Sequence, residues 1–317
     1  MKPLPTDRIS GFAKFAWFTL AYNILVILWG VFLRASKSGD GCGQHWLTCQ
    51  GEVIPSAPEL KTIIEFSHRM TTGPAFVLVI ILAIWAFRKF AKGHPARKTA
   101  LISLFFIITE ALVGAGLVLT GNTAETLTDA RPFWAIGHLL NTFTLLLFLA
   151  LTAWYASGER ELSISGRTKQ VVLIALGVIA ILFVGTSGSV AALSNMLFPS
   201  QSLTEGIAKD FSAGSNILLR LRVSHPILSI LTSVYLLFLA GWLRSASKDN
   251  PDVARWSNYL SILVLMQIAF GAATFLTLAP IMMQIGHLLL ADLIWISLVL
   301  LSANFLSKPS SANPLRA

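Results

Sequence analysis

The sequence predicts an all-α integral membrane protein with eight transmembrane helices, arranged as two tandem parallel four-helix bundles. Of its 317 residues, 55% are hydrophobic and only 12% are charged, about half the charged fraction of an ordinary soluble domain. Eight stretches are long and apolar enough to cross a bilayer, which takes about 20 residues each. The first four stretches also share sequence features with the last four. A soluble enzyme of this length is therefore excluded.

The helices are expected near residues 12–34, 65–88, 99–120, 132–156, 169–191, 217–243, 255–278 and 281–306. The first stretch has no small-residue cleavage site and is too long for a signal peptide, so we expect it to be retained. With a cytoplasmic N-terminus, 16 of the 24 Lys and Arg residues fall on the cytoplasmic side. This bias predicts a multi-pass protein of the cell (plasma) membrane with both termini cytoplasmic.

The formal net charge of +9 is spread over the short loops between the helices. A nucleic-acid partner would require the basic residues to gather in one patch. The lipid bilayer, and not nucleic acid, is therefore the expected surrounding of this chain.

An internal repeat divides the chain into two halves, residues 1–160 and 161–317. His68 in the second helix and His225 in the sixth lie 157 residues apart, and the sequence Ile-Gly-His-Leu-Leu occurs at both 136–140 and 285–289. Each half has four helices, an even number, so both halves cross the membrane in the same orientation. Such parallel repeats are related by an axis along the membrane normal.

Four histidines occupy equivalent places near the outer ends of the even-numbered helices: His68, His138, His225 and His287. A polar residue inside a bilayer is costly and usually functional. Two histidines from facing helices can supply both axial ligands of a heme iron. Zinc or copper would need further ligands, and no Cys, Asp or additional His recurs at that depth. We therefore expect two heme sites, His68 with His138 and His225 with His287.

The two halves differ beside the first histidine. Glu65 lies three residues before His68, so both side chains project from one helix face, and the equivalent position in the second half is Arg222. A carboxylate beside a heme ligand in one half only suggests that this half is catalytic and that the other is an electron-transfer or structural site. The alternative is a carboxylate stabilised at a helix N-terminus or paired with Arg69.

Arginines cluster at the outer membrane face, where heme propionates would lie. Their guanidinium groups suit carboxylates, although interfacial snorkelling is equally expected for each one alone. The residues concerned are Arg69, Arg131, Arg220 and Arg222. Two acids lie deep in the helices, Glu110 and Asp292, and the sequence leaves open whether they form local hydrogen bonds or a proton path.

The first outer loop contains both cysteines, Cys42 and Cys49. An oxidising outer compartment permits a disulfide, and the intervening residues are enough to close the loop. Zinc binding with His45 is less favoured because three ligands fall short of a closed structural site. The sequence leaves open whether the disulfide is structural or redox-active.

A family resemblance rests on two segments. Residues 39–51, Gly-Asp-Gly-Cys-Gly-Gln-His-Trp-Leu-Thr-Cys-Gln-Gly, and residues 64–69, Ile-Glu-Phe-Ser-His-Arg, resemble the outer loop and second helix of bacterial heme A synthases. The likeness extends over all eight helices and is closest to the subgroup with a cysteine pair in this loop. Thr48 and Phe66 are mild departures from the family pattern.

The resemblance implies an enzyme that oxidises a methyl group of heme O to a formyl group, giving heme A for terminal oxidases. Carried over by position, His68 and His138 would ligate the substrate heme, and His225 and His287 would ligate a heme b cofactor. Glu65 would be the catalytic acid, and the heme sites would lie near the outer face. The partners implied are heme O, the heme O synthase (protoheme farnesyltransferase) and an electron donor.

Two other classes fit parts of the pattern. A diheme electron-transfer cytochrome b would also need four helical histidines, but it would bind two similar, permanent hemes and would not need Glu65. A transporter built from parallel repeats would explain the duplication and not the paired histidines.

Overall fold

A computed structural model describes residues 10–158 and 160–309 of the chain. The prediction of an all-α, multi-pass membrane protein is confirmed, because eight spans are long and apolar enough to cross a membrane. These spans are α1 (Gly11–Ala35), α2 (Leu60–Lys89), α3 (Pro95–Leu119), α4 (Arg131–Ala156), α5 (Thr168–Leu197), α7 and α8 together (Ile217–Arg222 and Ser224–Ala246), α9 (Pro251–Leu276) and α10 (Ile281–Leu306). The chain ends that the charge bias assigns to the cytoplasm, with Lys2, Arg8 and Arg316, lie outside the described residues.

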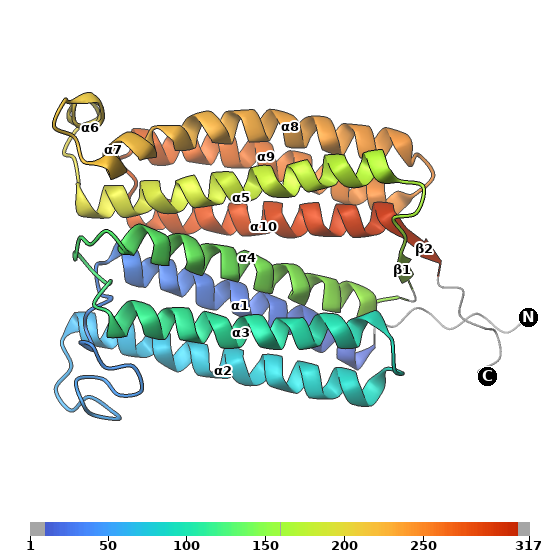
Figure 1. The fold of residues 1–317 in the computed structure, drawn as a ribbon, viewed down its shortest axis with the longest axis horizontal. Helices are drawn as coiled ribbons and strands as arrows, with labels where there is room; N and C mark the ends of the chain where they lie inside the picture. Colours follow the sequence, from blue (N-terminus) through green and yellow to red (C-terminus); the bar gives the residue numbers. More distant parts are fainter. Residues whose placement is uncertain (1–9, 159, 310–317) are drawn as a thin grey trace, which may run out of the picture.

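The spans run along one another in two neighbouring groups (Figure 1). Helices α1 to α4 lie side by side in the lower part of the view, and α5, α8, α9 and α10 lie in the upper part. The longer connections, residues 36–59, 120–130 and 198–216, all lie at one end of the helices. We call this the long-loop end.

Local sequence signals explain several helix starts. Ser10 caps α1 by accepting a hydrogen bond from Ala13 N (3.2 Å), and prolines occupy the first turns of α3, α4 and α9, where no backbone N–H is needed. His94, which the sequence places in a loop, caps α3: its Nδ1 accepts from Ala96 N (3.1 Å). A loop histidine next to a proline is thus a helix cap here.

Several elements differ from the prediction. Helix α2 begins at Leu60, so Glu65 lies in its second turn and not at its N-terminal end. The sixth predicted helix is interrupted at Val223, because Pro226 has no N–H and its ring clashes with the carbonyl of Arg222 four residues earlier. A short helix, α6 (Leu203–Phe211), occurs where we expected a loop.

Helix α10 joins the two groups. In its most apolar window 67% of the residues are buried inside the protein, against 11% to 39% in the other spans, and it packs against α1 and α4 as well as α9. Trp295 Nε1 donates to the carbonyl of Phe143 (2.8 Å), and the two rings stack with centroids 5.3 Å apart. At the other end from the long loops, strand β1 (Arg160–Leu162) pairs antiparallel with β2 (Ser307–Pro309). The two halves of the sequence therefore share one continuous core.

Candidate functional site

His225 of α8 and His287 of α10 face each other. Their ring centroids lie 6.2 Å apart and their planes make an angle of 84°. Two imidazole nitrogens bound to one metal ion at about 2 Å each place their ring centroids about 6 Å apart. Ser187 Oγ lies 3.1 Å from Nδ1 of His225, which leaves Nε2 of that ring available. This pair has the spacing of two ligands on opposite sides of one iron.

His68 of α2 and His138 of α4 form the second predicted pair. Nδ1 of His68, of His138 and of His287 is buried without a hydrogen-bond partner among the described residues. An unpaired buried nitrogen is costly. When Nε2 of an imidazole binds a metal ion, Nδ1 carries the ring hydrogen and needs an acceptor.

Glycines on neighbouring helices lie against three of the four histidine rings. A Cβ atom at Gly188 would lie 2.9 Å from Cε1 of His225, one at Gly271 would lie 3.1 Å from Cε1 of His287, and one at Gly30 would lie 3.2 Å from Cε1 of His68. The absence of a side chain at these positions lets a helix backbone approach each ring.

These residues fit heme iron better than a bare metal ion. Among the described residues, no group of three or more His, Cys, Asp or Glu side chains is arranged to hold a metal. Heme iron takes its four equatorial ligands from the porphyrin, so two axial histidines complete its coordination.

Gly188→Ala should weaken heme binding at the His225 and His287 pair by roughly tenfold or more, because the new methyl group meets the His225 ring. Gly114→Ala is the matched control, since it is also within a transmembrane helix and a Cβ there meets nothing within 4 Å. Heme titration of the purified proteins measures both affinities. Equal affinities in the two variants would show that Gly188 has no role in ligand placement.

Glu65 is held between α2 and the first long loop. Its side chain is only 3% exposed. Oε2 accepts a hydrogen bond from Cys42 N (2.8 Å), and Oε1 forms an ion pair with Arg69 one turn further along the helix. The pairing with Arg69 that the sequence allowed is therefore confirmed. A carboxylate has about four acceptor sites, so Glu65 keeps capacity for a further contact.

Arg69 forms hydrogen bonds to the first long loop, residues 36–59. Its NH1 group donates to the backbone carbonyls of His45 (2.6 Å), Trp46 (3.1 Å) and Thr48 (2.9 Å). The loop is also closed by the predicted disulfide between Cys42 and Cys49, both of which are buried. The disulfide uses both sulfurs, so the zinc alternative is wrong. The loop, Arg69 and Glu65 thus form one connected unit.

Cys42 and Cys49 should resist labelling by a membrane-impermeant maleimide until a reductant is added, because both sulfurs are in the disulfide. Mass spectrometry of the labelled protein counts the modified cysteines. Labelling of both cysteines in the unreduced protein would contradict the disulfide.

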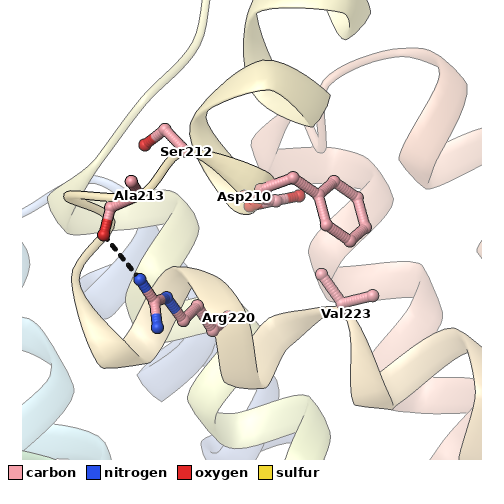
Figure 2. A pocket seen from close by; sticks show the side chains of 6 residues that line it. Asp210, Ser212, Ala213, Arg220 and Val223 are labelled. Carbon is pink, nitrogen blue, oxygen red and sulfur yellow. Dashed lines mark hydrogen bonds between the residues drawn. The ribbon is translucent and has the colours of Figure 1, made fainter.

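Each of the four arginines predicted to cluster forms hydrogen bonds to a different backbone segment. Arg131 donates to the carbonyls of Ala124 and Thr126, and Arg69 holds the first loop. Arg220 donates to the carbonyl of Ala213 (2.7 Å; Figure 2). Backbone carbonyls in the loops thus take up part of the donor capacity of these arginines, and their contact with heme propionates stays a prediction.

Arg222 and Arg34 also lie at the long-loop end. Arg222 forms an ion pair with Asp210 (2.6 Å) and donates to Asn195 Oδ1 (2.8 Å). Arg34, which the sequence analysis did not single out, donates to Gln284 Oε1 (3.2 Å) and links α1 to α10. The sequence feature that could have identified Arg34 is its position at the end of the first apolar stretch.

A cavity of about 450 Å³ lies at the long-loop end beside α6 and α7 (Figure 2). It is lined by Asp210, Phe211, Ser212, Ala213, Arg220 and Val223. None of the four histidines lines it, so it is separate from the two histidine pairs.

Curated relatives cover most of this chain. A protein of Thermus thermophilus named "Protoheme IX farnesyltransferase" is 44% identical over 305 residues, which are 96% of this chain and 50% of that protein. The chain thus spans about half the length of this relative. A "Heme A synthase" of Shouchella clausii is 29% identical over 90% of this chain and 94% of its own length.

A second "Heme A synthase", from Halalkalibacterium halodurans, is 41% identical over 127 residues, which are 40% of this chain and 42% of that protein. The resemblance to heme A synthases is confirmed by these relatives. Residues 13–299 match the family described as "Cytochrome oxidase assembly protein". The chain belongs to this family, COX15-CtaA.

Proposed function

We propose that this chain is a heme A synthase, which oxidises a methyl group of heme O to a formyl group. The observation that carries the proposal is the asymmetry between two histidine pairs: Glu65 accompanies His68, whereas Arg222 stands at the equivalent place before His225. The names of the curated relatives support the same activity.

The two halves have separate roles in this proposal. In residues 1–160, His68 and His138 hold the iron of the substrate heme. In residues 161–317, His225 and His287 hold a heme b cofactor. The 6.2 Å separation of the second pair of rings supports the cofactor site.

A methyl C–H bond is unreactive, so its oxidation depends on the redox chemistry that bound heme supplies. Glu65 is the group that accepts or returns the proton at the substrate methyl. Cys42 N and the Arg69 guanidinium fix its two oxygens, which orients the carboxylate. Two successive two-electron oxidations each add one hydroxyl group to the methyl carbon, which requires either dioxygen together with electrons from a donor, or water together with an electron acceptor. The resulting hydrated aldehyde loses water to leave the formyl group.

The membrane position suits a farnesylated substrate, whose apolar tail would lie along the lipid-facing helices. We propose that the long-loop end faces outward from the cell membrane, with both termini cytoplasmic and the heme sites near the outer face. Arg69 and Arg131 are proposed contacts of the heme propionates. A guanidinium has five donors, so their bonds to loop carbonyls leave further N–H groups.

A protoheme farnesyltransferase is the proposed partner that supplies heme O. This chain aligns with half of a Thermus protein of that name, and the other half of that relative lies outside the match. We also propose that an electron donor supplies electrons to the bound hemes.

A diheme electron-transfer cytochrome b is the second candidate, favoured by the equivalence of His68 with His225 and of His138 with His287. It gives no role to Glu65.

Heme extraction from cells that make heme O separates the two candidates. With this chain expressed, chromatography and mass spectrometry should detect a formyl heme, and without it none. If the chain inserts and binds heme, yet extracts contain heme O and protoheme alone, the synthase proposal is wrong.

A further inference from the structure

The strongest unexplained feature is a polar cluster deep between α3 and α4. Glu110 accepts hydrogen bonds from Asn141 Nδ2 (2.5 Å, to Oε2) and Thr142 Oγ1 (2.5 Å, to Oε1). Thr109 Oγ1 donates to Asn141 Oδ1 (2.6 Å). Asp292, the other deep acid, has no hydrogen-bond partner for either oxygen among the described residues. Both oxygens of Glu110 thus accept hydrogen bonds from neighbouring side chains, whereas neither oxygen of Asp292 does so among the described residues.

Glu110 also reaches a proposed iron ligand. Its Oε1 lies 3.4 Å from Nδ1 of His138, slightly beyond a well-formed N–H···O bond of about 2.7 to 3.2 Å. Nδ1 of His138 is buried and has no other polar partner in the part of the chain that the structure describes. Such contacts are often long without the bound reactant and shorten when it binds.

The second half lacks this cluster. At the positions equivalent to Thr109, Glu110, Asn141 and Thr142 it has Met266, Gln267, Leu290 and Ala291. Three polar side chains are thus replaced by apolar ones, and the carboxylate is replaced by a neutral amide. Gln267 Nε2 lies 3.4 Å from Nε2 of His287, the other ring nitrogen. The repeat itself therefore does not require the cluster.

A carboxylate that accepts the free N–H of a ligating histidine fixes the ring and makes it a stronger electron donor. A stronger donor favours the more highly charged, oxidised iron. The second half has a neutral amide in place of this carboxylate, and that amide lies beside Nε2 of His287 rather than beside Nδ1. The two sites should therefore differ in reduction potential because of residues outside the ligand pairs.

We propose that Glu110 is a positioning residue that accepts the Nδ1 hydrogen of His138 and makes iron bound in the first half easier to oxidise than iron bound in the second. This inference rests on the proposed function, in which the first half holds the heme that is oxidised. Asn141 and Thr142 hold the Glu110 carboxylate in place for that contact.

The test is a spectroelectrochemical titration of the purified full chain in lipid, supplied with protoheme and heme O. The titration step that disappears in His68→Ala belongs to the first half. Glu110→Gln should shift the reduction equilibrium of this step toward the reduced form by about tenfold, which is 59 mV for a one-electron couple. The step of the second half should not move.

Thr142→Ala is the matched variant, because Ala291 stands at the equivalent position. It removes one donor from Glu110, and the carboxylate then accepts more strongly from His138, so the equilibrium should shift toward the oxidised form. A purely structural role for the cluster predicts the same shift in both variants. If Glu110→Gln loses its first-half heme, the direction of the shift in Thr142→Ala alone distinguishes the positioning role of Glu110 from a purely structural role.

The proposal is overturned if Glu110→Gln binds both hemes without a shift, if Thr142→Ala does not shift toward the oxidised form, or if no heme binds through His68 in the wild type. Heme A formation is measured separately. If the wild type shows different reduction potentials at its two heme sites but never forms heme A, the synthase proposal is wrong, and the proposed role of Glu110 still holds.

Discussion

Glu65→Gln is expected to lower heme A formation by about 100- to 10,000-fold, the usual contribution of an essential acid or base. Glutamine keeps the shape of the side chain and can still accept from Cys42 N, but it cannot exchange a proton. His68 and His138 are unchanged, so heme content should persist, and heme O or a hydroxylated intermediate should accumulate. Liquid chromatography with mass spectrometry of extracted heme measures all three species.

Glu52→Gln is the control in the same loop. Glu52 is exposed and bonds to Ser56 N (2.6 Å) rather than to α2, so its loss should leave heme A formation nearly unchanged. Normal heme A production by Glu65→Gln, with the variant inserted and loaded with heme, would refute the catalytic role. The carboxylate would then serve only to hold the loop through Cys42 and Arg69.

His225→Ala and His287→Ala should each remove the heme of the second half and leave the first half able to bind. The reason is that each proposed ligand pair lies within one half, with the His225 and His287 rings facing each other. Pyridine hemochrome assay per mole of protein should fall from two hemes toward one. His45→Ala, which changes an exposed loop histidine, should keep both.

The outcome that contradicts this assignment is loss of both hemes in His225→Ala while circular dichroism shows intact helices. That result would mean that the ligands pair between the halves. The shared core along α10 makes this test necessary, since α10 contacts α1 and α4 as well as α9.

The helices were predictable because hydropathy over about 20 residues reports directly on membrane crossing. The break at Val223 was also readable, since Pro226 removes a helical hydrogen bond. Helix α6 was missed because it is short, although Ser202 followed by Glu205 is a capping-box signal, and Ser202 Oγ does accept from Glu205 N (3.2 Å).

The candidate site was predictable only in part. The internal repeat identified the four histidines, and the four-residue spacing allowed the Glu65 and Arg69 pair. The bond from Cys42 N to Glu65 joins residues 23 apart in sequence, and that from Arg34 to Gln284 joins residues 250 apart. Such contacts depend on how loops and helices pack, which no local pattern records.

The heme composition of the purified wild-type chain distinguishes a heme A synthase from a diheme cytochrome. Protein isolated from cells that make heme O should contain one protoheme per chain, together with a second heme that is a mixture of heme O and heme A. The heme A fraction should disappear in Glu65→Gln, while the protoheme remains. Two protohemes per chain, with neither heme O nor heme A bound even when heme O is supplied, would contradict the synthase activity and favour the diheme cytochrome.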